Sequence, residues 1–380
     1  MKNKQKLYSI ALASATLIFL FSVLILSVAS AEQVTRIGNG SDPAVYGNRV
    51  VWTDSGVIHV YDLTSKTDTT VSSSAASHPA IYDNKLVWHD ESSGVPRLTV
   101  YDIPSGARSY ITKDIDNRSV PAIYGNRIVW SAKYNESNHD SNVYIRDIST
   151  STQTQIGDGS RPDIYDTKVV YHSDSEDPEV DMNIRMYDIN TKKKITVNSS
   201  GDPEDPHIWG TKIIWADWYN LMGYIAMYDT STGKTIDVTH EADVDANGNQ
   251  YGASTGTHIA IQGDKIVYNK ISTDPEGSAG VYVYNITSGK STLLYNYPPG
   301  TYTTPDVYGD IVVWGFDTNY GYSTNNIGTY LCNLETQSET RITSPENDTE
   351  NKGLHIPSTP SFEIYSGIAS LFAVLLYKKK

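Results

Sequence analysis

Short apolar runs broken by a two-residue polar turn recur along this chain, and residues 121–130 show the pattern most clearly. Their sequence, PAIYGNRIVW, contains an apolar run, the pair Gly125-Asn126 and a second apolar run that ends in Trp130. Gly, Asn and Asp tolerate the positive φ that a tight hairpin requires. The pattern therefore predicts two antiparallel strands, called here strands a and b, joined by a tight turn.

The same ten-residue unit occurs seven times. The copies span residues 43–52, 79–88, 121–130, 162–171, 206–215, 259–268 and 305–314. A spacing of roughly 40 residues is the period of a propeller blade. Strand b is apolar without alternation, which indicates burial on both faces, as between stacked blades. Strand a often carries an alanine, which fits the taper of an innermost strand.

Two further runs complete each unit. Strand c, such as Ile58–Asp62, ends in Asp or Asn, and a Thr-rich strand d follows, such as Thr152–Ile156. We expect these Asp and Asn side chains to cap the c–d turns through the backbone. Four strands in each of seven units predict an all-β fold, a seven-bladed β-propeller of four-stranded antiparallel blades, over residues 32–343.

Two segments compete to close the ring. Val34–Ile37 and Thr340–Thr343 both resemble strand d, although seven blades need only one of them. Pairing of the N-terminal strand into the last blade would remove an open sheet edge. The pattern leaves open which segment does so.

Both ends of the chain resemble targeting segments. Residues 1–31 have a basic head, an apolar stretch and the small-residue sequence Ala29-Ser30-Ala31, which indicates a secretory signal peptide; an uncleaved anchor is the alternative. Residues 344–361 are a polar linker. Residues 362–380 contain an apolar run of about 14 residues before three lysines, shorter than the roughly 20 of a spanning helix. We therefore expect an extracellular protein held at the cell surface by a membrane or sorting tail.

Charge and cysteine content narrow the classes of partner. The formal net charge of −14 disfavours a nucleic-acid partner. The only cysteine, Cys332, excludes an internal disulfide. It occupies the strand-c position of Tyr284 in the preceding copy, so we expect it to be buried.

The longest connections all join strands b to c or d to a, so we expect them to gather on one face, called here the long-loop face. They span residues 131–142, 172–183, 216–223, 240–257, 269–280 and 315–326. Aromatic side chains on loops of a rigid scaffold suit sugar or protein contacts, with ordinary loop packing as the alternative. The candidate ligand-binding residues are Tyr134, Trp218, Tyr219, Tyr251, Tyr320 and Tyr322.

Six Asn-x-Ser/Thr sequons are possible glycosylation sites in an exported chain, although chance alone produces several in a chain this rich in Ser, Thr and Asn. They begin at Asn39, Asn117, Asn135, Asn198, Asn285 and Asn347, and the first four lie on the long-loop face.

One loop has the spacing of half a calcium site. Asp243, Asp245, Asn247 and Asn249 surround Gly248 as in the first part of a calcium-binding loop. Ser254 stands at the twelfth position, where such a loop needs a bidentate Glu. Calcium is therefore a possible cofactor, a solvated acidic loop is the alternative, and no other cofactor is predicted.

No catalytic set is recognisable. Gly252-Ala-Ser254-Thr-Gly256 matches the nucleophile elbow, but that motif requires a strand-to-helix turn of an α/β sheet. His89 and His172 directly follow strand b, where structural roles are expected. The sequence thus predicts that the protein is not an enzyme.

The units PAIYGNRIVW and VYIRDIST resemble the TolB-like propeller repeat of surface proteins from methanogenic archaea, over residues 34–343. The tail resembles the PGF-CTERM type of archaeal sorting signal, with Pro360-Ser361-Phe362 in place of Pro-Gly-Phe. That resemblance implies cleavage near this tripeptide and replacement of the tail by a lipid anchor.

Three hypotheses for function follow. The first is an exported binding or envelope-interaction module that recognises a cell-envelope protein or glycan through the long-loop face. The second is an extracellular enzyme acting on polysaccharide or peptide through that face or the central channel, and it requires convergent carboxylates or histidines at the channel mouth. The third is a structural component of a surface layer.

Overall fold

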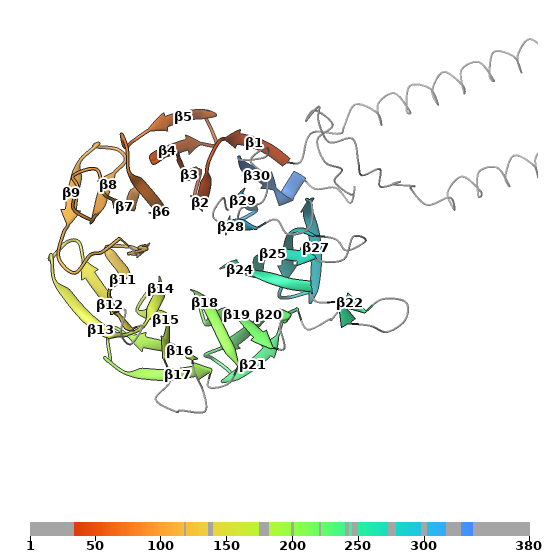
Figure 1. Ribbon diagram of the computed structural model, residues 1–380. Coiled ribbons are helices and arrows are strands. Elements are labelled where there is room, and N and C mark those ends of the chain that lie inside the picture. Colours follow the sequence, from red (N-terminus) through yellow and green to blue (C-terminus); the bar gives the residue numbers. More distant parts are fainter. Residues whose placement is uncertain are drawn as a thin grey trace, which may run out of the picture. The chain divides into compact units, whose positions relative to one another are not determined.

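The computed structural model describes residues 34–117, 119–135, 140–174, 182–198, 201–219, 222–239, 243–244, 250–251, 253–272, 279–297, 302–316 and 328–336. All of them belong to the first of the chain's two units, Met1–Thr343, and the second unit, Ser344–Lys380, lies outside the described residues. Within the described part, seven four-stranded antiparallel sheets form a ring, and one two-stranded hairpin stands apart from them. The predicted seven-bladed β-propeller is confirmed (Figure 1).

Blades 1 to 3 follow one another along the chain. Blade 1 contains β2 (Ser41–Tyr46), β3 (Arg49–Asp54), β4 (Val57–Asp62) and β5 (Thr67–Thr70). Blade 2 contains β6 (Ala76–Tyr82), β7 (Lys85–Asp90), β8 (Arg97–Asp102) and β9 (Arg108–Ile111). Blade 3 contains β10 (Ala122–Tyr124), β11 (Arg127–Asn135), β12 (Asp140–Asp147) and β13 (Gln153–Asp158).

Blades 4 to 6 repeat this order. Blade 4 contains β14 (Ser160–Tyr165), β15 (Lys168–Asp174), β16 (Met182–Asp188) and β17 (Lys194–Asn198). Blade 5 contains β18 (Asp202–Trp209), β19 (Lys212–Tyr219), β20 (Met222–Asp229) and β21 (Lys234–Asp237). The two-stranded hairpin β22 (Asp243–Val244) and β23 (Gln250–Tyr251) precedes blade 6, which contains β24 (Ala253–Gln262), β25 (Lys265–Ser272), β26 (Gly280–Asn285) and β27 (Lys290–Asn296).

Blade 7 is built from both ends of the described chain. It contains β28 (Thr303–Tyr308), β29 (Ile311–Phe316), β30 (Thr329–Asn333) and, as its outer strand, β1 (Val34–Gly38); the 3₁₀ helix η1 (Leu334–Thr336) follows β30. β1 pairs antiparallel with β30, with Val34 opposite Cys332 and Arg36 opposite Tyr330. The N-terminal strand therefore closes the ring, which settles a choice that the sequence left open. Thr340–Thr343 lies outside the described residues.

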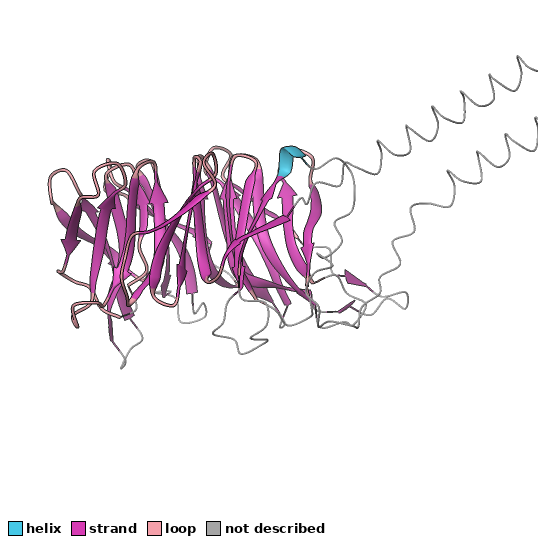
Figure 2. Ribbon diagram, turned by 90° about the horizontal axis from the view of Figure 1, so that it is seen from above, coloured by secondary structure: helices cyan, strands magenta, loops and turns pink. Residues whose placement is uncertain are grey.

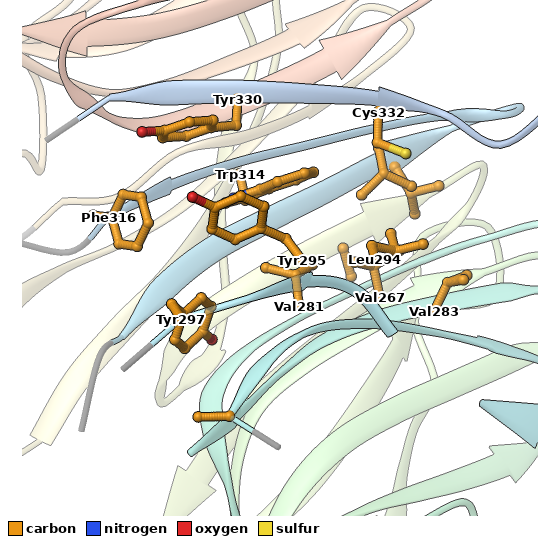
Figure 3. Close-up of a cluster of buried hydrophobic side chains, with 14 residues drawn as sticks. Val267, Val281, Val283, Leu294, Tyr295, Tyr297, Trp314, Phe316, Tyr330 and Cys332 are labelled. Atoms are coloured by element: carbon orange, nitrogen blue, oxygen red, sulfur yellow. The ribbon is translucent and has the colours of Figure 1, made fainter. Parts of the chain in front are cut away.

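Seven apolar clusters fill the seven interfaces between neighbouring blades. Each strand b contributes side chains to two of these clusters. In blade 1, for example, Val51 packs toward blade 2, while Val50 and Trp52 pack toward blade 7. This confirms that strand b is buried on both faces. Figure 3 shows the cluster between blades 6 and 7, where Trp314 stacks on Tyr330 and Cys332 is fully buried, as predicted.

The tight turns of each blade are bonded to one another. The first residue of every a–b turn has a φ of 53–64°, so the predicted turn residues are confirmed. In all seven blades the backbone N–H that follows strand c donates to the carbonyl of the second a–b turn residue, at 2.7–2.9 Å; Leu63 and Asn48 form this bond in blade 1. The a–b and c–d turns therefore share one face, called here the turn face. The strands run between this face and the opposite one (Figure 2).

The Asp or Asn that ends strand c caps the c–d turn in each blade. Its Oδ1 accepts a backbone N–H two or three residues later; Asp62, Asp102, Asp147, Asp188, Asp229, Asn285 and Asn333 all do so. The predicted capping role of these residues is confirmed.

The predicted loop boundaries were partly wrong. β11, β15, β19 and β25 extend three to five residues beyond the ten-residue units into segments expected to be loops, and β12, β16 and β20 begin earlier than expected. Consequently His89 and His172 lie within β7 and β15 rather than after them. Polar strand ends can keep their backbone pairing without any apolar signal, so the pattern of hydrophobic residues underestimates them.

Candidate functional site

Strand a of each blade lies nearest the axis of the ring (Figure 1), and in four blades it contains a local irregularity at its proline. The residue before that proline has a φ of 49–51° in four blades, at Asp42, His78, Arg161 and Asp205. The strand pairing shifts register at the same four places. Such bulges turn a side chain out of its normal strand direction. Asp tolerates a positive φ, whereas in His78 and Arg161 it is strained, and strain of this kind clusters at functional sites.

The bulges bring ionisable side chains of neighbouring blades together at the axis, on the side away from the turn face. His207 Nδ1 lies 3.5 Å from Asp163 Oδ2, and His207 Nε2 lies 3.5 Å from Asp205 Oδ2. Nearby, His258 Nδ1 lies 3.9 Å from the same Asp205 oxygen, and Arg161 lies 3.4 Å from Glu204. We call Arg161, Asp163, Glu204, Asp205, His207, His258 and Asp306 the axial cluster.

The two carboxylates hold His207 in its charged form. Burial by itself would lower the pKa of His207, but the hydrogen bonds and charges of Asp163 and Asp205 outweigh it and raise the pKa to about 10. Burial likewise would raise the pKa of Asp205, yet His207 and the charges around it lower the pKa to about 2. At neutral pH the three groups therefore form an imidazolium between two carboxylates.

Asp163 and Asp306 also link neighbouring blades through hydrogen bonds to the backbone. Asp163 accepts N–H groups from Ile164 of its own strand and Ile208 of blade 5, at 2.8 and 2.9 Å. Asp306 does the same between Val307 of blade 7 and Val45 of blade 1, at 2.8 Å each. These two acids follow the strand-a proline, where four other copies have alanine.

Asp306 keeps some contact with solvent although protein atoms surround it closely. Burial is the largest influence on its carboxyl and raises the pKa to about 6, against the opposing effect of its two backbone hydrogen bonds. The charges of His207 and Asp163 also act on it, which places all three groups around one axis.

Replacing His207 tests the charge arrangement through stability. Because the folded-state pKa of about 10 lies above the ordinary 6.5, the stabilisation is fully present below pH 6.5 and is lost as the pH rises through 10. We expect His207→Gln to lower the free energy of unfolding more at pH 6 than at pH 10.5. Denaturant titrations of both proteins at the two pH values measure this. An equal loss at both would show that His207 acts only by its shape.

The structure describes the backbone of four of the six candidate ligand-binding residues predicted from the sequence. Tyr134 lies in β11, Trp218 and Tyr219 lie in β19, and Tyr251 lies in β23, so all four belong to strands rather than loops. Their side chains lie outside the described residues, as do Tyr320 and Tyr322 entirely. The contact role of these aromatic residues stays a prediction.

The predicted calcium loop is described only at its edges. Asp243 lies in β22, while Asp245, Asn247 and Asn249 lie outside the described residues. In the described part of the chain, no three His, Cys, Asp or Glu side chains are arranged to hold a metal ion. That finding includes the axial cluster.

Two sequons have described side chains with bonds of their own. Asn39 is exposed, and its Oδ1 accepts from Arg36. Asn285 uses Oδ1 to cap a turn and donates Nδ2, the atom that would carry a glycan, to Asp264 at 2.7 Å. Glycosylation of Asn285 would therefore cost that hydrogen bond. Asn117 is exposed, the side chains of Asn135 and Asn198 are not described, and Asn347 lies outside the described residues.

Sequence reasoning missed the axial cluster. The signal that could have shown it is the difference between copies at the position after the strand-a proline, where Asp163, His207 and Asp306 replace alanine. As for a membrane, none of the helices in the described ranges is long and apolar enough to cross one.

No family model matches the chain, and no curated protein sequence matches it. Solved structures do resemble it. The propeller domain of the Trilobed protease from Pyrococcus furiosus matches with a TM-score of 0.57 at 14% identity, over 81% of this chain and 99% of that one. That domain is described as having an open velcro topology, whereas β1 closes the ring here.

Two further structures extend the comparison. An oligogalacturonate lyase in complex with manganese matches with a TM-score of 0.55 at 13% identity, over 80% of this chain and 94% of that one. TolB from Acinetobacter baumannii matches with a TM-score of 0.45 at 16% identity, and the chain spans 62% of its length. At these identities the two matches with TM-scores above 0.5 show the fold alone, a β-propeller.

Proposed function

We propose that this protein is an exported binding module of the cell surface, and that its ligand, a protein or glycan of the envelope, contacts the axis from the long-loop face. The observation that carries the proposal is the axial cluster. Ionisable side chains from three neighbouring blades and from blade 7 converge there and keep contact with solvent.

The chemistry of the cluster suits a polar ligand. Glu204 and Asp205 offer carboxylate oxygens as acceptors, while Arg161 offers donors, and about half of the Arg161 side-chain surface is exposed. A glycan hydroxyl or a peptide group both donates and accepts, so it can bond to either kind of group. The turns of the opposite face offer fewer free backbone groups, since in every blade the a–b and c–d turns are already bonded to one another.

Export and anchoring rest on the terminal segments, residues 1–31 and 362–380, which lie outside the described residues. Mass spectrometry of the mature protein tests both together. We expect a new N-terminus close to residue 32 and a C-terminus close to Pro360 that carries a lipid. Intact termini on a cytoplasmic protein would contradict the proposed location.

The double variant Arg161→Ala/Glu204→Ala tests the axial cluster as the ligand site. We expect binding to envelope preparations and to glycan arrays to fall at least tenfold, because the donor and acceptor groups nearest solvent are removed. Lys234→Ala is the matched control, since Lys234 lies exposed on the outer strand β21, far from strand a in blade 5. Unchanged binding by the double variant would contradict the assignment of the site.

The enzyme alternative keeps one observation in its favour. It required convergent carboxylates or histidines at the axis, and His207 with Asp163 and Asp205 meets that condition. However, a histidine whose pKa is raised to about 10 is already protonated at neutral pH, so it cannot act there as a general base. Turnover of oligogalacturonate or peptides that is lost in His207→Gln would favour the enzyme instead.

A further inference from the structure

A second arrangement of side chains surrounds the axis at the turn face. The last residue of strand a is aromatic in six blades and glutamine in the seventh, and all seven side chains keep partial contact with solvent. We call this set the aromatic collar; it consists of Tyr46, Tyr82, Tyr124, Tyr165, Trp209, Gln262 and Tyr308.

The rings of the collar are evenly spaced around the axis. Neighbouring centroids lie 4.5–5.0 Å apart, in an unbroken series from Tyr308 through Tyr46 to Trp209. Successive ring planes differ by 42–58°. In a ring of seven blades, each blade is rotated from the next by one-seventh of a full turn, and that angle falls in the middle of this range. The ring planes therefore stand parallel to the axis rather than across it.

The tyrosine hydroxyl groups approach one another at this level. The hydroxyl group of Tyr46 lies close enough to those of Tyr82 and Tyr308 to raise its pKa, and the hydroxyl group of Tyr124 is affected in the same way by Tyr82. Together with the ring spacing of 4.5–5.0 Å, this places a string of hydroxyl oxygens around part of the axis.

Such a string has more acceptors than donors to offer a ligand. A tyrosine hydroxyl carries one hydrogen and two lone pairs. Where hydrogens are shared along the string, each oxygen still has a lone pair. The hydroxyl groups also stay uncharged, because burial first and the neighbouring hydroxyl groups second raise the pKa of Tyr46 and of Tyr124.

Three of the six cations that begin strand b already bond to a neighbouring blade, so they do not occupy the collar. Arg49 donates to Asn84 Oδ1 at 2.7 Å, Arg127 donates to the carbonyl of Asp166 at 3.2 Å, and Lys265 lies 3.3 Å from Asp310. Each of these cations thus reaches along the rim to the a–b turn of the next blade. Close to the collar, Asp166 adds negative charge beside Tyr124.

We propose that the aromatic collar is a binding site for a primary ammonium group, such as the end of a lysine side chain or an alkylamine. An ammonium group has three donors and no acceptor, which complements a ring of hydroxyl lone pairs. The alkyl stem of such a ligand packs against the aromatic rings. The site lies at the opposite end of the axis from the axial cluster, so it does not depend on the function proposed above.

Titration with n-butylammonium, with n-butanol as a neutral probe of matched length, tests the proposal on the full chain. Trp209 lies in the collar, so its fluorescence reports on binding, and Trp209→Phe identifies that part of the signal. We expect saturable binding of the amine at least tenfold tighter than binding of the alcohol, confirmed by calorimetry. Equal affinities, or no saturable binding of the amine, would overturn the proposal.

The triple variant Tyr46→Phe/Tyr82→Phe/Tyr124→Phe removes three oxygens and keeps every ring in place. We expect it to fold and to lose at least tenfold in affinity for n-butylammonium. Tyr110→Phe, on the outer strand β9, is the control and keeps its affinity. Undiminished affinity in the triple variant would overturn the role of the hydroxyl groups.

Discussion

Replacing Trp130 by alanine is expected to lower the free energy of unfolding by about 3–5 kcal/mol, the range for removal of a buried Trp or Phe side chain. Trp130 is fully buried within β11 and stacks on Tyr144 at 5.7 Å. It belongs to the cluster between blades 2 and 3, so the resulting cavity weakens an interface between blades rather than one sheet. Denaturant titration followed by circular dichroism measures the change.

Phenylalanine substitutions separate packing from hydrogen bonding at this position. The indole N–H of Trp130 donates to the carbonyl of Asp114 at 2.8 Å, whereas the described residues offer no partner to the indole N–H of Trp88, which is equally buried in the preceding copy. We therefore expect Trp130→Phe to cost about 1 kcal/mol more than Trp88→Phe. Equal losses would mean that the Asp114 bond contributes nothing to stability.

The double variant Thr35→Pro/Arg36→Pro is expected to separate β1 from β30 and to lower the free energy of unfolding by roughly 4 kcal/mol. This figure assumes about 1 kcal/mol for each hydrogen bond of a ladder with four residue pairs. Successive N–H groups of a strand point in opposite directions, so one of the two prolines must remove a bond to β30. The loss also exposes the edge of β30 in a blade that holds the two ends of the ring together. Thermal unfolding measures the change, and hydrogen exchange locates it.

The matched control places two prolines in another outer strand, at Asp68 and Thr69 of β5. That strand pairs with β4 inside a blade whose strands are continuous in sequence, so its loss leaves the ring closed. We expect the β5 variant to lose less stability and to show faster exchange only in blade 1. A loss as large as that of the β1 variant would show that ring closure adds nothing beyond local pairing.

Most of the fold follows from local rules that repeat seven times. The period of the copies predicted the number of blades, the Gly or Asp that begins each a–b turn predicted a positive φ, and the Asp or Asn after strand c predicted a cap. Each of these depends on residues within one blade. Ring closure depends on a contact between Arg36 and Tyr330, almost 300 positions apart, so the pattern showed two competing strands without deciding between them.

The axial cluster was not predicted because it is not part of the repeat. His207 and Asp163 occupy the same position in their copies, where four other copies have alanine. When the copies are aligned, the two residues look like variation at a position that favours a small side chain. Only the ring places these side chains within 3.5 Å of each other. By contrast, the aromatic collar is visible in six of the seven copies, yet a residue that recurs this regularly suggests packing first.

The bonds between paired turns have a practical consequence for engineering this chain. A peptide inserted into an a–b or c–d turn would break one of the seven identical backbone contacts and disturb two turns at once. The Ser93-Gly94 turn between β7 and β8, at the other end of the strands, is exposed, and the N–H of Gly94 donates to the carbonyl of Glu91 in the same loop. Epitopes or fluorescent tags should therefore be grafted at this turn, where the scaffold can accept new sequence without rearranging.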